Sequence, residues 1–183
     1  MSRLLYAMIQ YSELSLVGRK QESLDLNSVL SKLIKEIDPP ENMRITIENK
    51  LPVIIIVRKF IEELFENLIR NAIMYMDKPE GYIKITCVEE NGWWKFSVTD
   101  NGPGIEKRYH EKVFKIFQML SLRDETENIG IGLSIVKKIV ELYDGQVWID
   151  SQVGQGCTFF FTLPKSSNVI YECVDAELEA ALV

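Results

Sequence analysis

The sequence predicts an α+β protein, a two-layer sandwich in which helices cover one face of a mixed, mostly antiparallel sheet. Helical segments carry apolar residues at spacings of three and four, and strand segments alternate, but the two kinds do not follow one another as a parallel βαβ sheet requires. The pair Asn91-Gly92 joins two alternating segments, which is typical of a tight hairpin. A chain of 183 residues is long enough for one domain with its own core.

The first elements expected are two helices separated by a polar linker. Leu4 to Val17 carries two apolar stripes near heptad spacing, and the polar stretch from Gly18 to Ser23 ends this helix. Asn27 is expected to cap a second helix that runs to about Ile37, where Pro39-Pro40 stops it. Two strands follow, an alternating one at Arg44–Glu48 and an apolar, buried one at Val53–Val57.

The longest helix is expected from Arg58 to Met76, because apolar residues recur along it in two adjacent stripes. Gly130 opens a further helix to about Tyr143, and Gly145 ends it. The strands of this half of the chain are expected at Tyr82–Glu89, Trp93–Thr99, Gln146–Asp150 and Cys157–Leu163.

Composition excludes several classes of protein. The net charge of −6 argues against nucleic-acid binding, which needs a basic surface to neutralise phosphates. The cysteines are odd in number and lack C-x-x-C spacing, so neither a disulfide framework nor a zinc site is indicated. The longest apolar run, Val53–Val57, is shorter than the ~20 residues of a membrane span, and Met1–Gln10 lacks the apolar core of a signal peptide. We therefore expect a soluble, cytoplasmic domain, which further segments of a parent protein would still be able to anchor in a membrane.

Four polar residues recur every four positions on the longest helix, at Glu63, Asn67, Asn71 and Tyr75. Each lies about 40° around the helix from the one before it, so that together they form a slowly winding strip. Such a strip is normally the solvent-exposed face of a helix. Asparagine is a weak helix former, however, and its presence at two of these positions favours a role in binding a metal ion. An amide oxygen suits Mg²⁺, which also keeps waters and phosphate oxygens as ligands.

Three glycine turns accompany this strip. The segment Asp100-Asn101-Gly102-Pro103-Gly104-Ile105 places a carboxylate in a turn directly after a strand. Gly130-Ile131-Gly132-Leu133 precedes a helix whose free N–H groups and positive dipole end can receive phosphate. Because no βαβ unit surrounds that turn, a dinucleotide-binding fold is rejected. Gly154, Gly156 and Thr158 form the third element, which also fits a simple hairpin turn.

In this order the motifs resemble those of the ATP-binding catalytic domain of bacterial and archaeal two-component sensor histidine kinases. The resemblance runs from about Leu24 to Lys165 and implies the Bergerat-type ATP-binding fold of that kinase and ATPase superfamily. It implies an enzyme, a protein histidine kinase that binds ATP with Mg²⁺. Such a kinase would transfer the γ-phosphate to a histidine on a dimerisation hairpin, for signal transduction to a response regulator.

The resemblance also implies roles for individual residues. Asn67 and Asn71 match the asparagines that hold Mg²⁺ against the ATP phosphates. Asp100 matches the carboxylate that accepts a hydrogen bond from the adenine amino group, which favours ATP over GTP because guanine presents an acceptor oxygen there. Phe114 and Phe117 match the F-x-x-F element of the lid over the nucleotide. The catalytic residues expected are Asn67 and Arg123, and the nucleotide-binding residues are Asn67, Asn71, Tyr75, Asp100, Gly102, Gly104, Ile105, Phe117, Gly130, Ile131, Gly132, Leu133 and Thr158.

The same resemblance divides the chain into three parts. Residues 1–22 would be the end of a dimerisation-hairpin helix with its linker, residues 23–165 the kinase domain, and residues 166–183 a C-terminal tail. The only histidine, His110, lies in the lid region and not on an acceptor helix, so we expect it to take no part in the reaction. The acceptor would then lie on a histidine-bearing dimerisation domain outside this chain, and the full-length kinase would be a homodimer.

The sequence departs from the family pattern at several positions. Relatives commonly carry a basic residue where this chain has Met74, an arginine where it has Met119, and a threonine in the turn formed by Asn128-Ile129. Val57 stands where many relatives have an aspartate that caps the long helix. These departures leave open a degenerate nucleotide-binding or partner-docking module without kinase activity. A hydrolase like the gyrase, Hsp90 and MutL ATPases is a third interpretation, but those enzymes carry a water-activating glutamate where Asn67 stands.

Overall fold

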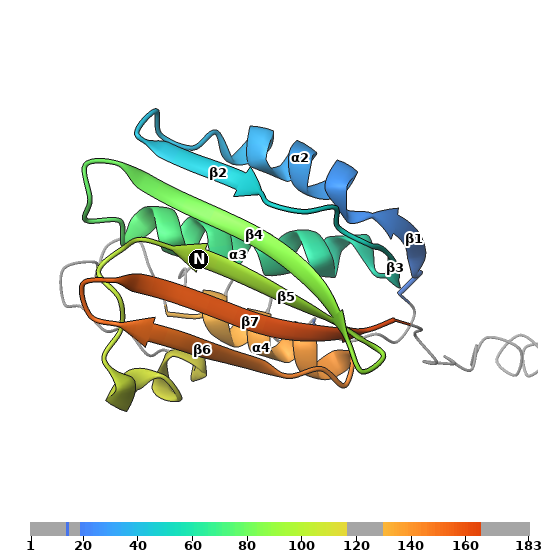
Figure 1. The fold of residues 1–183 in the computed structure, drawn as a ribbon. Helices are drawn as coiled ribbons and strands as arrows, with labels where there is room; N and C mark the ends of the chain where they lie inside the picture. The colour runs from blue at the N-terminus through green and yellow to red at the C-terminus, as the bar shows by residue number, and fades with distance from the viewer. Residues whose placement is uncertain (1–13, 15–18, 117–129, 166–183) are drawn as a thin grey trace, which may run out of the picture.

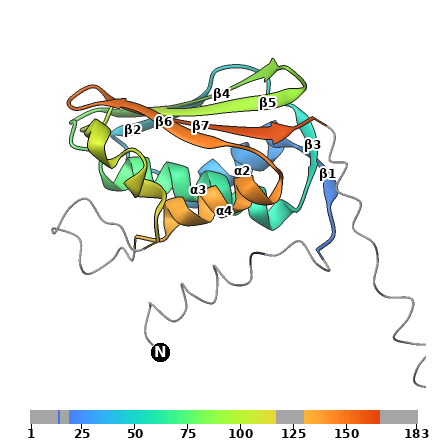
Figure 2. The ribbon, with the colours of Figure 1, turned by 90° about the horizontal axis from the view of Figure 1, so that it is seen from below.

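The computed structural model describes residue 14 and residues 19–116 and 130–165, and these residues form two layers. Figure 1 shows a sheet in front of the helices, and Figure 2 shows the same sheet lying above them. The helices therefore cover one face of the sheet, and the predicted α+β fold is confirmed. The helix expected at 4–17 and the acidic run at 175–182 lie outside the described residues. No helix within the described part of the chain is both long and apolar enough to cross a membrane.

The large sheet has the strand order β2-β4-β5-β7-β6. Its only parallel pair is β2 with β4, and the remaining neighbours are antiparallel. The sheet is therefore mixed and mostly antiparallel, as the sequence predicts. The strands are β2 (Met43–Ile47), β4 (Gly81–Glu90), β5 (Trp93–Asp100), β6 (Val147–Gln152) and β7 (Gly156–Pro164).

Two features of the sheet position the site described below. Asn91 and Gly92 join β4 to β5, and both have left-handed φ angles, 52° and 83°, as a tight two-residue hairpin requires. This hairpin leaves Asp100 as the last residue of β5, opposite Cys157 near the start of β7. The end of β5 and the beginning of β7, which are both inner strands, therefore lie side by side at one end of the sheet.

The helices of the described chain are α2 (Leu26–Ile37), α3 (Arg58–Met74) and α4 (Gly132–Leu142). The expectation that Asn27 caps α2 is wrong, because Asp25 is the N-cap and its side chain accepts a hydrogen bond from the Asn27 N–H at 3.0 Å. The amide of Asn27 instead bridges to Leu51, donating to its carbonyl at 2.9 Å and accepting its N–H at 3.0 Å. Asn27 therefore joins the start of α2 to the segment before strand β3 (Val53–Ile56).

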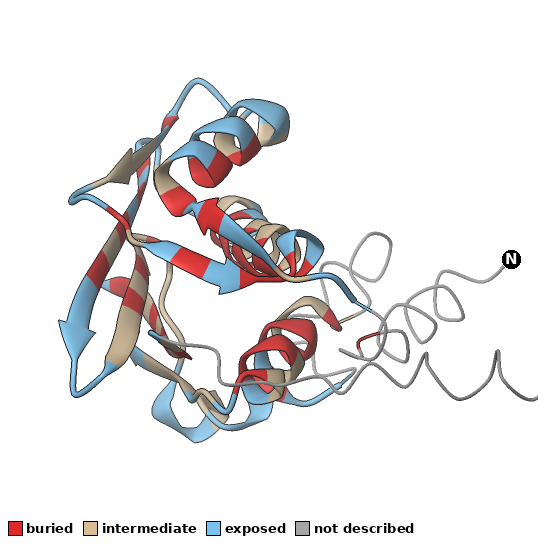
Figure 3. Ribbon diagram, turned by 90° about the vertical axis from the view of Figure 1, so that its right-hand side faces the viewer, coloured by how far each residue is buried: buried red, intermediate tan, exposed pale blue. Residues whose placement is uncertain are grey.

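The core between the layers centres on three aromatic rings. Phe65 of α3 meets Phe96 of β5 and Phe161 of β7 edge to face, with ring centroids 6.0 and 5.5 Å apart. Phe96 and Phe161 stack on each other at 4.9 Å. Figure 3 shows that the buried residues lie on the facing sides of the helices and the sheet. These contacts fix α3 over the middle of the sheet, and with it the polar strip that includes Asn67 and Asn71.

A second, two-stranded sheet pairs β1 (Glu22–Asp25) with β3 (Val53–Ile56). The prediction of a fully buried strand at Val53–Val57 is wrong in part: Val53 and Ile55 are 59% and 54% exposed, whereas Ile54 and Ile56 are buried. An apolar run without polar interruption is typical of a strand covered on both faces. Here only one face of the small sheet is covered, so alternate residues of the run remain in contact with solvent.

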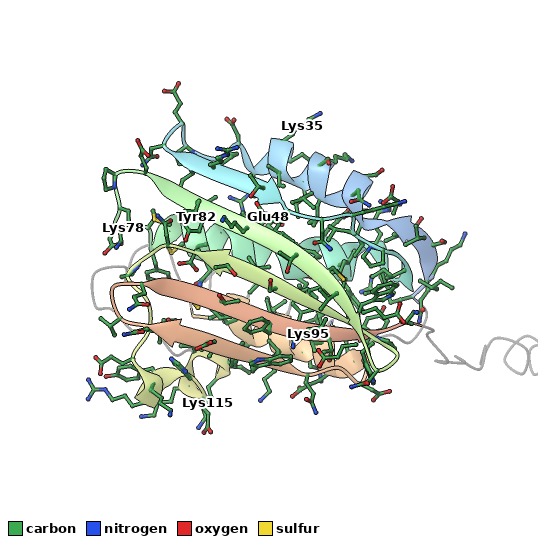
Figure 4. The ribbon with its side chains drawn as sticks, viewed as in Figure 1. Lys35, Glu48, Lys78, Tyr82, Lys95 and Lys115 are labelled. Carbon is green, nitrogen blue, oxygen red and sulfur yellow. The ribbon has the colours of Figure 1, made fainter. Side chains whose placement is uncertain are left out.

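The face of the large sheet that points away from the helices carries its own side-chain contacts. Lys95, labelled on this face in Figure 4, has its Nζ 5.7 Å from the ring centroid of Trp148 and 5.8 Å from that of Phe160. These two rings stack at 5.3 Å. The hydroxyls of Thr99 and Thr158 lie 3.0 Å apart on the same face, because alternate residues of a strand point to the same side.

Tyr143 supplies a test of how α4 supports α3. Helix α3 begins at Val57 without a side-chain cap, and the buried N–H of Val57 donates instead to the Tyr143 hydroxyl at 3.0 Å. Tyr143→Phe should lower the free energy of unfolding by about 1–3 kcal/mol, because it leaves a buried donor without its acceptor. Denaturant titration would measure this loss, with Tyr82→Phe on the exposed face as the control, expected to change stability by less than about 0.5 kcal/mol. Equal stability of Tyr143→Phe and the parent would contradict the prediction.

Candidate nucleotide-binding site

A cavity of about 470 Å³ lies between α3, the start of α4 and the strand edge formed by β5 and β7. Its walls come from elements that are far apart in the sequence, so the fold has to assemble them. The lining residues are Asn67, Arg70, Asn71, Ala72, Met74 and Tyr75 from α3, Asp100, Cys157 and Phe159 from the strands, and Pro103, Gly104, Ile105, Val113, Gly130, Gly132 and Leu133 from the remaining segments.

Asn67 of α3 lies against the first residue of α4, Gly132. Its Nδ2 donates to the backbone carbonyl of Glu63 at 2.8 Å, so the amide nitrogen is used within α3 and Oδ1 is the end offered to other groups. A Cβ on Gly132 would lie only 2.7 Å from this Oδ1. The absence of a side chain at Gly132 therefore allows the first residue of α4 to approach Asn67. Asn71 lines the cavity one helical turn further along α3.

The beginning of α4 is uncapped. Ile131 is the N-cap residue and provides no side-chain hydrogen bond, and the first turn contains no acidic residue. Ser134 does not substitute for a cap, because its hydroxyl donates to the Ile131 carbonyl at 2.7 Å. The first N–H groups of a helix lack intrahelical partners and form the positive end of its dipole. Since Gly130, Gly132 and Leu133 line the cavity, this end of α4 is suited to an anionic group.

Asp100 places a carboxylate at the strand edge of the cavity. It is only 8% exposed, and its Oδ1 accepts a hydrogen bond from the Gly102 N–H at 2.8 Å. Burial raises the pKa of the Asp100 carboxyl above its usual value, and hydrogen bonds from the backbone of Gly102 and Cys157 act in the opposite direction without cancelling this effect. A buried acceptor of this kind suits a ligand that presents N–H donors.

Glycines allow the turn between β6 and β7 to close against the loop that follows Asp100. Gly104 and Gly156 have φ angles of 70° and 102°, which favour glycine. A Cβ on Gly104 would overlap the carbonyl of Gln152, and one on Gly156 would overlap the carbonyl of Asp100. Both positions are therefore restricted to glycine by conformation and by space.

Hydrogen bonds lock the same two loops together. The N–H of Gly154 donates to the Pro103 carbonyl at 2.6 Å. The Ser151 hydroxyl accepts the N–H of Ile105 and donates to the carbonyl of Gly156, each at 2.8 Å. The loop that carries the Asp100 carboxylate is thus held in place on the side away from α3.

The segment after this loop forms two short 3₁₀ helices, η1 (Lys107–Tyr109) and η2 (Lys112–Phe114). Phe114 is buried and meets Phe159 edge to face, with ring centroids 6.1 Å apart. His110 lies between the two turns, where its Nε2 is 2.9 Å from the carbonyl of Ile105. The His110 side chain thus contacts the backbone of Ile105, which lines the cavity, but His110 does not line the cavity itself.

The structure brings most of the sequence-predicted residues to the cavity. Gly102 and Ile131 do not line it but shape it, through the hydrogen bond to Asp100 and the N-cap of α4. Phe117 and Arg123 lie outside the described residues. The predicted residues that line the cavity are Asn67, Asn71, Tyr75, Asp100, Gly104, Ile105, Gly130, Gly132 and Leu133.

Thr158 is not brought to the cavity. It points to the opposite face of the sheet, where its hydroxyl pairs with that of Thr99. The neighbouring residues Cys157 and Phe159 line the cavity instead. The sequence could have indicated this. Only every second residue of the predicted strand Cys157–Leu163 can point to the same face as Asp100, and Cys157 is the residue directly opposite Asp100.

Arg70 and Val113 also line the cavity without having been expected from the motifs. Arg70 lies between the two asparagines in the sequence, and the four-residue spacing that singled them out passes over it. Val113 belongs to η2, and η2 contacts the cavity only because the chain folds back toward the cavity after the loop that follows Asp100. No sequence pattern predicts that contact.

A divalent cation in this cavity would depend on amide oxygens and on its ligand. In the described part of the chain there is no group of three or more His, Cys, Asp or Glu side chains that could hold a metal ion. Asn67 Oδ1 and the amide of Asn71 are neutral, hard oxygen donors of the kind that Mg²⁺ accepts when phosphate supplies the negative charge. The donor set therefore fits a metal that arrives together with phosphates.

A family model described as histidine kinase-, DNA gyrase B-, and HSP90-like ATPase matches residues 56–167. Cyanobacterial phytochrome A of Nostoc sp. is 42% identical over 114 residues, which cover 62% of this chain and 15% of that protein. The adaptive-response sensory kinase SasA of Synechocystis sp. is 32% identical over 172 residues, which cover 90% of this chain and 45% of that protein. The chain thus spans less than half the length of these relatives.

Solved structures show the same fold. The catalytic domain of the histidine kinase ThkA superimposes with a TM-score of 0.67 at 27% identity, covering 80% of this chain and 96% of that one. Full-length ShkA in complex with AMPPNP superimposes with a TM-score of 0.75 at 22% identity, covering 90% of this chain and 35% of that one.

The raised pKa of Asp100 gives a prediction about stability. A carboxyl whose pKa is higher in the folded than in the unfolded state reduces stability as the pH rises through the interval between the two values, and the reduction remains at neutral pH. Asp100→Asn should therefore unfold at a higher temperature than the parent at pH 7.5, and the difference should shrink as the pH falls through the raised pKa. Thermal unfolding across this pH range measures it, with Asp150→Asn on exposed β6 as the control. A less stable Asp100→Asn variant at every pH would show that the backbone hydrogen bonds outweigh burial.

Proposed function

Because this chain belongs to the family of histidine kinase-, DNA gyrase B- and HSP90-like ATPases, we propose that its cavity binds Mg·ATP and that the bound ATP phosphorylates a histidine on a separate dimerisation hairpin. The observation that carries the proposal is the distribution of charge in the cavity. A buried carboxylate stands at one end, and an uncapped helix N-terminus beside an asparagine oxygen stands at the other. An adenine nucleotide has the complementary order, with N–H donors on the base and negative charge on the phosphates. The AMPPNP complex of ShkA supports this ligand.

The base would lie at the Asp100 end. Its amino group would donate to the Asp100 carboxylate, which burial has already separated from water. The same contact disfavours guanine, whose oxygen at this position would leave the carboxylate facing another acceptor. Ile105, Val113 and Phe159 provide apolar surface around the ring. In this proposal Cys157, and not Thr158, is the strand residue next to the base.

The phosphates would lie at the start of α4. The first N–H groups of α4, which have no partner within the helix, and the positive end of the helix dipole favour negative charge there. Asn67 and Asn71 would hold Mg²⁺ through their amide oxygens, and the ion would neutralise the phosphate chain. Phe117 would place an aromatic ring over the nucleotide, and Arg123 would place a positive charge near its phosphates.

The side chains near the phosphates favour transfer to an incoming imidazole over attack by water. A hydrolase needs a general base within reach of the attacking water, and the amide of Asn67 cannot serve as one. Glu66 is paired with Arg70 at 2.7 Å, and Glu63 does not line the cavity. Bound ATP would therefore persist until a partner presents a histidine in line with the γ-phosphate, and positioning and electrostatics would then carry the reaction.

The chain would act as the catalytic part of a larger sensor kinase. It spans 15% and 45% of the phytochrome and SasA relatives, so their remaining segments leave room for input and dimerisation domains. We propose that residues 1–22 lead from the dimerisation hairpin, that residues 23–165 are the kinase domain, and that residues 166–183 form a tail. The full-length protein would be a cytoplasmic-facing homodimer that passes its phosphate to a response regulator.

Asn71 tests the metal part of the proposal. Asn71→Ala should weaken ATP binding roughly tenfold in the presence of Mg²⁺, by comparison with other groups around bound metals. In EDTA the loss should be much smaller, because the missing group is an ion ligand and not a base contact. Calorimetric titration of ATP under both conditions measures the difference. Equal losses in Mg²⁺ and EDTA would assign Asn71 a purely structural role.

Phosphotransfer tests the function itself. Incubated with labelled ATP and Mg²⁺, this chain should not become stably phosphorylated on histidine, but it should label a separately supplied dimerisation hairpin that carries a histidine. The Asp100→Asn variant, which should lose about 1.5–3 kcal/mol of ATP binding, serves as the control with an impaired site.

Three outcomes would contradict this prediction. Label on the chain itself that disappears in His110→Ala would make His110 an acceptor, despite its contact with the Ile105 carbonyl. Rapid ATP hydrolysis in the absence of any hairpin would favour a gyrase- or HSP90-like ATPase. ATP binding without transfer to any hairpin would support the degenerate binding module.

A further inference from the structure

We propose that Arg70 of α3 binds the phosphate chain of the nucleotide through its two terminal amino groups, an inference that rests on the proposed function. Among the described residues that line the cavity, Arg70 is the one cationic side chain, and Asp100 is the one carboxylate. Met74, one turn further along α3, also lines the cavity and is uncharged. A fixed positive charge in the described walls can therefore come only from Arg70.

The position of Arg70 places its charge at the phosphate end of the cavity. It follows Asn67 by three residues, which corresponds to about 4.5 Å along the helix and about 60° around it. Long side chains on a helix lean toward its N-terminus, and here the Arg70 Nε reaches back to Glu66 Oε1 at 2.7 Å. The guanidinium thus lies at the level of Asn67, where Gly132 brings the start of α4 against α3.

The contact with Glu66 leaves the guanidinium suited to phosphate. Among the described residues Arg70 makes one hydrogen bond, from Nε to Glu66, so with respect to this part of the chain the four N–H donors on its terminal amino groups are left for a ligand. These donors lie in one plane and match two oxygens of a phosphate. The ion pair joins side chains that are 55% and 41% exposed, so it adds little to stability. Its effect is to hold the guanidinium in one orientation.

The negative charge of ATP explains why a contact between Arg70 and the phosphates would favour binding. The phosphate chain of ATP carries more negative charge than one Mg²⁺ ion and a helix N-terminus neutralise. Arg70 adds a full positive charge on the side of α3, opposite the N-terminus of α4. The Glu66 carboxylate lies next to the same position and repels the phosphates, so the two members of this ion pair should affect ATP binding in opposite directions.

Binding of ATP, ADP and adenosine to the complete chain tests the inference. Arg70→Gln should weaken ATP and ADP roughly fivefold to twentyfold, a range reduced from that of a buried charge-assisted contact because Arg70 is half exposed. Adenosine has no phosphates, and its affinity should not change. Arg70→Lys should fall between Arg70→Gln and the parent, since it keeps the charge but lacks the planar pair of amino groups.

Glu66→Gln separates phosphate binding from helix stability. It breaks the same ion pair from the other side, so a purely structural role for the pair would make both variants lose affinity. We expect Glu66→Gln to bind ATP a few times more tightly than the parent. Arg58→Gln, at the start of α3 and outside the cavity, is the matched control and should leave all three affinities unchanged.

The outcomes distinguish this inference from the proposed function. A parent chain that binds ATP, together with an Arg70→Gln variant that loses equal affinity for ATP and adenosine or none for either, would overturn the role of Arg70 and leave the ATP site intact. A parent chain that does not bind ATP would overturn both. Loss of ATP affinity in both Arg70→Gln and Glu66→Gln would show that the ion pair acts through the structure of α3.

Discussion

The close approach of α4 to α3 at Gly132 and Asn67 is the constraint on which the rest of the site depends. Behind α3, the Phe65, Phe96 and Phe161 cluster fixes this helix against the sheet, so α3 cannot shift to make room. A Cβ at position 132 would lie too close to Asn67 Oδ1, so either the Asn67 amide would have to turn out of its hydrogen bond with Glu63 or the beginning of α4 would have to shift. In either case the helix N-terminus and the amide oxygen would no longer face the same volume, and the phosphate of the proposed ligand would be expected to lose one of these two groups.

The opposite end of the cavity holds the carboxylate of Asp100, whose ionised form is disfavoured by burial. Burial raises the pKa of Asp100, and this makes its ionised form a source of instability before a ligand binds. The close approaches of Gly104 and Gly156 and the hydrogen bonds of Ser151 hold the loops around Asp100 together, and these loops keep its carboxylate buried. A ligand with N–H donors restores the lost hydrogen bonding. The site is thus prepared for binding at the expense of stability.

The sequence predicted the elements, and most of the residues that it singled out line the cavity, because their signals are periodic or local. Helical spacing identified Asn67 and Asn71, and glycines marked the turns. The errors arose where the outcome depends on contacts between distant segments. Asp25 caps α2 while Asn27 bridges to Leu51, and the exposed residues of β3 lie on the uncovered face of the small sheet that β3 forms with β1. Thr158 was assigned by motif, although its register opposite Thr99 directs it to the other side of the sheet.

The carboxylates of α3 connect this geometry to the choice between transfer and hydrolysis. Burial raises the pKa of the Glu63 carboxyl, which would make it a stronger base than an exposed glutamate. Its position counts against such a role, because Asn67 lines the cavity and lies against Gly132, whereas Glu63 does not line it and only accepts the Asn67 amide through its backbone carbonyl. Glu66 is the other neighbour, and its carboxylate is engaged by Arg70. In the proposed site, Asn67, Asn71 and Arg70 would therefore offer the phosphates two amides and a guanidinium, groups that bind charge but accept no proton from water. The nucleophile would then have to bring its own basicity, as an imidazole does.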